Sequence, residues 1–127
     1  MSQINDATVI AALRRQMSVA VARQVAAAGN LANIDTPGYK AKEVTFNEAL
    51  VSKLIGPGNS TYPSQADPKA GIVVRDAENL PARRDGNTVQ LDREMLSMGR
   101  AAGDFAAAQT ALAAKFRLVR YAINEGR

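Results

Sequence analysis

The sequence predicts an all-α dominated fold in which two long helices, one near each end of the chain, pair as a coiled-coil-like hairpin. At both ends, apolar side chains recur at alternating intervals of three and four residues, the heptad pattern of paired helices. Of the 24 alanines, 18 lie within residues 6–34 and 88–124, which favours slim helices that approach closely. We expect one structural unit of three parts: residues 1–39, an irregular middle at 40–87, and residues 88–127.

Composition excludes several function classes. The 127 residues include no Trp, Cys or His, so disulfides, thiolate chemistry and the commonest general base and metal ligand are absent. We therefore expect neither an enzyme nor a cofactor. The 16 basic and 12 acidic residues are interspersed, which is typical of a solvated surface rather than a nucleic-acid site.

The sequence also lacks the patterns of a membrane span and of a secretory signal. No segment approaches the ~18 to 20 consecutive apolar residues of a membrane span. The start of the sequence, with Asn5 and Asp6, lacks the basic-then-apolar order of a secretory signal. We expect no membrane span and, if the protein leaves the cytoplasm, another export route.

Residues 6–34 are predicted to form the first long helix, with Asp6 or Asn5 as its N-cap. A helix of this length would span about 43 Å, so it needs a long partner. Its predicted seam, the apolar stripe that faces the partner helix, is interrupted only by Gln24 and comprises Ile10, Leu13, Met17, Ala20, Ala27, Leu31 and Ile34.

A stop signal follows this helix. In Thr36-Pro37-Gly38-Tyr39, Pro and Gly occupy the second and third positions of a four-residue turn, the order of a type II turn. Asn30 and Asn33 lie three residues apart, so both amides leave the helix from one face. For Asn33 or Asp35 taken singly, the alternative is a simple role in capping the helix end. The predicted assembly motif is Asn30, Asn33, Thr36, Pro37, Gly38 and Tyr39.

The middle of the chain has weaker signals. Thr45 to Glu48 fits a capping box, which predicts a short helix over 46–55. Breakers at 56–64 predict a flexible loop, taken as 56–70. Ile72-Val73-Val74 is a candidate short β element, and 76–85 is expected to be irregular.

The last helix is predicted to begin after the turn Asp85-Gly86-Asn87, with Asn87 as its N-cap and Gln90 three residues later. Gly99 and Gly103 lower its helix propensity, which is either neutral or a sign that a neighbouring backbone approaches closely. Its predicted seam, interrupted by Gln109, comprises Leu91, Met95, Met98, Ala102, Phe105, Leu112, Phe116, Val119 and Ile123.

Pairing of these two helices would leave their other, alanine-rich faces in water. Ordering a residue costs about 1–2 kcal/mol, and only one stripe of each helix would be buried to offset that cost. We therefore predict that the terminal helices are fully ordered only in a multi-subunit assembly.

The stretch Asn30-Leu31-Ala32-Asn33-Ile34-Asp35-Thr36-Pro37-Gly38-Tyr39-Lys40 resembles the signature of bacterial flagellar axial proteins, which form the rod and hook. Residues 44–50, 85–95 and 115–123 are similar to the proximal-rod members of the FlgB type, and residues 56–84 are unmatched. Leu31 replaces the usual Ile. Ala101, Phe105 and Ala106 stand where the family has Asn and Tyr-Gln, so no contact is carried over to them.

The resemblance implies a structural subunit of the proximal rod in the periplasmic basal body. Such subunits are exported unfolded by the flagellar type III apparatus and assemble helically with themselves, with other rod subunits and with the protein at the junction to the MS ring and export gate. The seam residues would form the tube wall. Asn30 and Asn33 would hydrogen-bond the backbone of a neighbouring segment.

Other functions stay open from the residues alone. A sister rod subunit shares the N-terminal signature, and a helical adaptor or chaperone would use the same seams. A nucleic-acid binder is disfavoured because the basic residues form no stripe and no aromatic stacking platform accompanies them. An enzyme is disfavoured because the carboxylates form no paired constellation.

Overall fold

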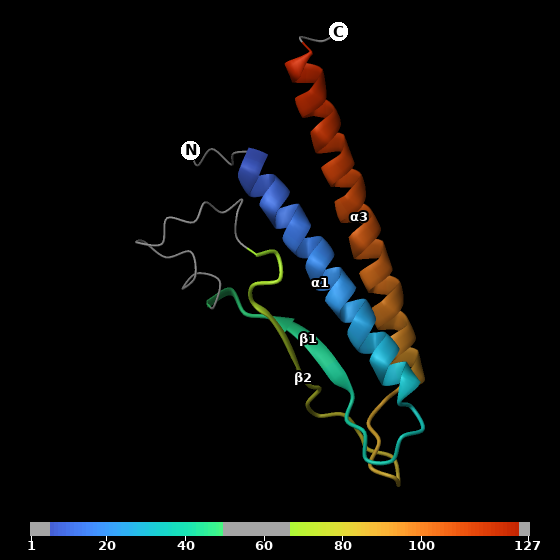
Figure 1. Cartoon of the computed structure of the whole chain (residues 1–127). Helices are drawn as coiled ribbons and strands as arrows, with labels where there is room; N and C mark the ends of the chain where they lie inside the picture. Colours follow the sequence, from blue (N-terminus) through green and yellow to red (C-terminus); the bar gives the residue numbers. More distant parts are fainter. Residues whose placement is uncertain (1–5, 50–66, 125–127) are drawn as a thin grey trace.

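The computed structural model describes residues 6–49 and 67–124. Its elements are α1 (Asp6–Ala32), β1 (Lys42–Phe46), β2 (Ile72–Asp76) and α3 (Leu91–Ile123). The two helices lie side by side and antiparallel, and the two strands form a small sheet on the other side of α1 from α3 (Figure 1). This confirms the mostly helical fold with a short β element in the middle.

The helices pack through their smallest side chains. Ala20 and Ala27 of α1 are buried, as are Ala101 and Ala108 of α3, and each pair is spaced by seven residues. Such a spacing returns to the same face of a helix after two turns, so the alanines form one stripe per helix. The stripes confirm the prediction of two slim helices that approach closely.

Ion pairs fix the alignment of the two helices. Arg23 of α1 lies 3.9 Å from Asp104 of α3. Lys115 Nζ lies 2.5 Å from Asp6, at the start of α1. Residues 116–123 of α3 therefore extend beyond Asp6, the first described residue of α1 (Figure 1).

In α1 the pattern of burial follows the predicted seam, whereas its role in a packed tube wall stays a prediction. Leu13, Met17 and Leu31 are half-buried, and Ala20 and Ala27, at intervening seam positions, are buried. The helix ends at Ala32 rather than at Ile34, because Asn33, Ile34 and Asp35 form a turn.

The predicted seam of α3 is wrong in part. Met98, Phe105, Leu112 and Val119 are half-buried beside the alanine stripe, as expected for seam residues. By contrast, Leu91, Met95, Phe116 and Ile123 are exposed, because the residues that face α1 at the centre are Glu94, Ala101 and Ala108. The heptad spacing was right, but the largest side chains do not mark the face that packs.

In the β-hairpin, the end of β1 lies where we predicted a helix start, whereas β2 forms at the predicted short β element. β1 and β2 pair antiparallel, with Lys42 opposite Asp76 and Phe46 opposite Ile72. Thr45 and Phe46 therefore belong to a strand, and the predicted helix start at Phe46 is wrong. Glu48 and Ala49 are helical, whereas the remainder of that predicted helix lies outside the described residues.

Beyond β2 the chain is irregular as expected, but its end differs from the prediction. The predicted flexible loop 56–70 lies outside the described residues up to 66, and residues 68–71 form a turn in which Ala70 N–H donates to the Asp67 carbonyl at 2.9 Å. α3 begins at Leu91 rather than near residue 88, and its N-cap Gln90 makes no side-chain capping bond. The prediction that Asn87 caps this helix is wrong.

Candidate functional site

The predicted turn motif lies at the closed end of the helix pair. There the chain leaves α1 and, after the hairpin and the irregular segment 77–90, returns to begin α3 (Figure 1). The Tyr39 N–H donates to the Thr36 carbonyl at 3.2 Å, and Gly38 has a φ of +73°. This four-residue hydrogen bond and the positive φ at the third position are the features of a type II turn, so the predicted turn is confirmed.

Asn30 joins the last turn of α1 to the start of β1. Its Nδ2 donates to the Lys42 carbonyl at 2.8 Å, and its Oδ1 accepts from the Lys42 N–H at 2.8 Å. The side-chain amide thus pairs with Lys42 as a neighbouring strand would. Oδ1 also accepts from the Tyr39 hydroxyl at 3.2 Å, and Asn30 has no exposed surface. The predicted bond to a neighbouring backbone exists for Asn30 within the chain.

Asn33 has a different role. Its Nδ2 donates to the Gly29 carbonyl at 2.8 Å, in its own helix, and its Oδ1 accepts from the Thr36 hydroxyl at 3.1 Å. The Gly29 carbonyl, in the last turn of α1, also accepts from the Asn33 N–H at 3.2 Å, so the side chain adds a second donor at the helix end. Within the chain Asn33 therefore caps α1, the alternative left open above, and the prediction that its side chain bonds another segment's backbone is wrong here.

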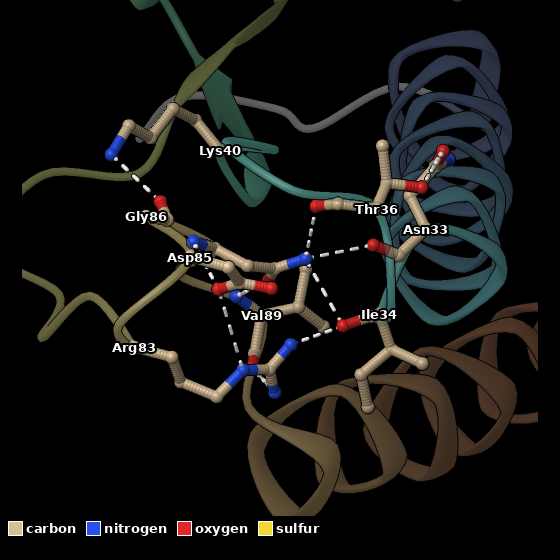
Figure 2. Close-up of polar contacts among 9 residues, drawn as sticks. Asn33, Ile34, Thr36, Lys40, Arg83, Asp85, Gly86 and Val89 are labelled. Carbon is tan, nitrogen blue, oxygen red and sulfur yellow. Dashed lines mark hydrogen bonds and ion pairs between the residues drawn. The ribbon is translucent and has the colours of Figure 1, made fainter.

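Asn87 is the central residue of the site, and sequence reasoning misassigned it. Its Nδ2 donates to the carbonyls of Asn33, Ile34 and Thr36 at 2.9, 3.0 and 2.8 Å. Figure 2 shows these carbonyl groups converging at the end of α1. Its Oδ1 accepts from the Val89 N–H at 2.8 Å, which fixes the amide in place. Asn87 is fully buried, and its amide holds the turn that follows α1 from a position more than 50 residues away in the sequence.

Backbone and side-chain bonds hold the two chain segments together on either side of Asn87. The Gly38 N–H donates to the Asp85 carbonyl at 2.8 Å, and the Thr88 N–H donates to the Tyr39 carbonyl at 3.0 Å. The Thr88 hydroxyl accepts from the Ala41 N–H at 2.8 Å. We call these two segments, residues 30–42 and 83–89, the joint.

Arg83 and Lys40 add cationic donors to the joint. Arg83 donates to the carbonyls of Ile34 and Val89, and Lys40 Nζ donates to the Gly86 carbonyl at 3.0 Å (Figure 2). Gly86, with a φ of +82°, lies against Gly38: a Cβ at Gly86 would be 3.5 Å from Gly38 Cα. Two glycine turns therefore stack at the end of the molecule.

A network of exposed ion pairs links the hairpin to α3. Glu43 of β1 accepts from Arg75 of β2 at 3.0 Å and lies 3.5 Å from Arg93 of α3. Lys42 pairs with Asp76 directly across the sheet. The hydrogen bond that Lys42 donates to the Asp76 carboxylate raises the pKa of Lys42 above its ordinary value of 10.5. The joint and this network together set the direction of the hairpin relative to both helices.

The geometry has the character of a structural site. Within residues 6–49 and 67–124 there is no group of three or more His, Cys, Asp or Glu side chains that could hold a metal. Over the same ranges, neither long helix is apolar enough to cross a bilayer. What the joint does is hold two long helices and a hairpin in one fixed arrangement.

The fold and joint together define an elongated helical subunit with a rigid closed end. No family model matches the chain. Comparison with curated proteins finds flagellar basal-body rod proteins FlgB: that of Salmonella typhimurium is 34% identical over 66% of this chain and 72% of the relative, and that of Escherichia coli is 36% identical over the same shares. The FlgB of Bacillus subtilis is 28% identical over 91% of this chain and 92% of the relative. The chain belongs to the FlgB family of flagellar basal-body rod proteins, and it is a structural subunit of the rod.

Proposed function

We propose that this chain forms part of the proximal rod. The type III apparatus exports it from the cytoplasm, and it then assembles helically with copies of itself and with other rod subunits to transmit torque. Its partners would include the protein at the junction to the MS ring and export gate. The family places the subunit in the rod; the position along the axis, the export route and the partners are the proposal.

One observation carries the assembly: α3 presents large apolar side chains that nothing in the described chain covers. Met95 is 60% exposed, Phe116 54% and Ile123 74%, and these residues lie along a helix about 50 Å long. Large exposed apolar side chains that gather in patches mark surfaces of contact with other proteins. These exposed apolar residues of α3 therefore fit a helix that packs against neighbouring subunits in a tube.

The joint supports the torque-bearing part of the proposal. A subunit that transmits torque needs a fixed angle between its helices and the rest of the chain. Here the turn between them is held by buried amides whose donors and acceptors all have partners, an arrangement that strongly specifies one geometry.

The test is deletion of the gene in its bacterium, followed by electron microscopy of isolated basal bodies, with a complementing copy as control. We expect membrane rings without any rod, and cells that do not swim. A short rod stub would place the chain further along the axis, as a sister rod subunit. Complete flagella would instead favour an adaptor or chaperone for another helical protein, which the same exposed residues could bind.

A further inference from the structure

An apolar groove runs between α1 and the β-hairpin, on the side of α1 that faces away from α3 (Figure 1). Its volume is about 520 Å³. Val21 and Val25 line it from α1, and Ile72 and Val74 line it from β2. At 100° per residue, Val21 and Val25 point away from the buried Ala20 and Ala27, so the groove and the helix pair use opposite faces of α1.

The groove is built for an apolar occupant. Val25 is 66% exposed and Val74 58%, although both belong to regular elements. The other α1 residues along it are small and leave room for a close approach: Ser18, Ala22, Ala26 and Gly29. An exposed apolar hollow of this kind marks a contact site.

The charge of the groove narrows the choice of occupant. Lys42 and Lys69 both line it. Lys42 is paired with Asp76. Within residues 6–49 and 67–124 the exposed Lys69 amine forms no ion pair, although the Lys69 backbone N–H donates to the Asp67 carboxylate at 2.9 Å. The occupant should therefore bring a carboxylate next to apolar side chains.

Two patches on α3 supply large exposed apolar side chains. The base patch consists of Leu91, Met95 and Leu96, with Asp92 beside them. The tip patch consists of Phe116, Leu118, Tyr121 and Ile123, with Arg117 and Arg120 among them.

Charge distinguishes these patches. Arg117 and Arg120 would bring more positive charge toward Lys69, which costs free energy. Asp92 is exposed, and it too has no ion-pair partner among the described residues. The base patch is the complementary one.

We propose that the base patch of one copy docks in the α1–hairpin groove of a second copy, with Asp92 facing Lys69. The proposal rests on the proposed function in one respect, that copies of this chain assemble. Because patch and groove lie on different surfaces of the molecule, the contact is heterologous. Repetition of such a contact produces a ring or an open helix rather than a closed dimer.

Cysteine cross-linking tests this contact, since the chain has no cysteine of its own. Val25→Cys and Met95→Cys are made in separate, differently tagged full-length proteins, which are mixed at high concentration and oxidised. We expect a mixed disulfide dimer between them. Val25→Cys with Leu118→Cys tests the tip patch, and Val25→Cys with Gln109→Cys is the matched control, because Gln109 is an exposed α3 residue between the patches.

The outcomes separate the alternatives. A Val25–Met95 yield above that of both other pairs supports the proposal. A higher Val25–Leu118 yield means that the tip patch occupies the groove, and equal yields or a preferred Met95–Met95 disulfide mean that the groove is not the self-contact; each of these overturns it. The deletion experiment reads out rod formation separately, so a failed cross-link leaves the proposed function standing.

A charge exchange tests the pairing of Asp92 with Lys69. Lys69→Glu in the Val25→Cys protein should lower the mixed-dimer yield by up to about fivefold at limiting concentration, the range for an exposed ion pair. Asp92→Lys in the Met95→Cys protein should restore it. An unchanged yield with Lys69→Glu, or no recovery in the exchanged pair, would remove Asp92 from the contact.

Discussion

The joint and the exposed face of α3 differ in how far the chain itself satisfies them: the amides of the joint are buried and hydrogen-bonded, whereas the large apolar side chains of α3 are uncovered. In the joint, Asn30 and Asn87 have no exposed surface, and their amides bond Lys42, Tyr39, Val89 and the end of α1. On α3, Met95 and Phe116 are more than half exposed, while the helix packs on α1 through alanine.

This difference separates two tasks within one chain. Buried polar groups are costly unless every donor and acceptor is satisfied, so a satisfied joint specifies a single geometry. Exposed apolar side chains gain free energy only when a neighbour covers them. The joint is thus complete in the single chain, whereas the large apolar side chains of α3 are not covered by the described residues.

The largest effect is expected from the central amide of the joint. Asn87→Asp removes the donor to three carbonyls and places an acceptor against them, so we expect a loss of about 3 kcal/mol or more in the free energy of unfolding. Denaturant unfolding at one fixed protein concentration measures it, because association itself shifts stability.

Asn33→Ala is the matched control for that substitution. The Gly29 carbonyl that accepts from its side chain also accepts from the Asn33 N–H at 3.2 Å, so one donor remains. A loss of about 1 kcal/mol or less is expected. Equal losses in the two variants would contradict the central role of Asn87.

A larger side chain should lower the stability of the helix pair at Ala101 but not at the neighbouring Ala102. Ala101→Leu forces a larger side chain between α1 and α3, where Ala101 is 1% exposed, and should cost about 1–3 kcal/mol of stability. Ala102→Leu lies on the exposed side and should leave monomer stability nearly unchanged. Thermal unfolding of both variants makes the comparison, and similar melting temperatures would contradict the observed packing face.

The turn offers a smaller effect with a functional readout. Gly38→Val puts a β-branched residue at a φ of +73°, which costs about 1–2 kcal/mol through backbone strain rather than through a clash, since a Cβ there meets no atom within 4 Å. We expect impaired rod assembly with secretion still detectable, measured by swimming and by immunoblot of exported protein. Gly99→Ala, in a helix with open space, is the stability control, and normal swimming of Gly38→Val would count against the geometric role.

Much of this fold could be predicted from the sequence, because its strongest signals are local. The α1 seam follows from one apolar stripe, and the type II turn follows from Pro37 and Gly38. On α3, apolar residues occupy more than one side, so periodicity alone could not choose between the Met95 and Phe116 positions and the Ala101 stripe. A Cβ at Gly99 or Gly103 would meet no atom of the described residues within 4 Å, so of the two alternatives for these glycines the neutral one fits the single chain.

The role of Asn87 could not be read locally. Asn followed three residues later by Gln90 satisfies the rule for a helix start, yet the acceptors of its amide lie 51 to 54 residues away. The available signal was that the backbone carbonyls of a tight turn need donors, here those of Asn33, Ile34 and Thr36 after α1. Phe46 was misassigned for a related reason, since Asn30 and β2 provide strand partners that are distant in sequence.

The smallest effect concerns the hairpin, where Lys42 and Asp76 pair in the open. The hydrogen bond that Lys42 donates to the Asp76 carboxylate raises the pKa of Lys42 above 10.5. Because the folded pKa is the higher one, the stabilisation by this pair is present below about pH 10.5 and is lost as the pH rises through the folded pKa. Asp76→Asn should return the pKa of Lys42 toward 10.5, and the stability difference between wild type and variant should shrink above that pH. Nitrogen NMR titration of the Lys42 amine measures the pKa directly; an unchanged midpoint in Asp76→Asn would show that the pair does not persist in solution, and the hairpin would then depend on its backbone ladder and on Asn30.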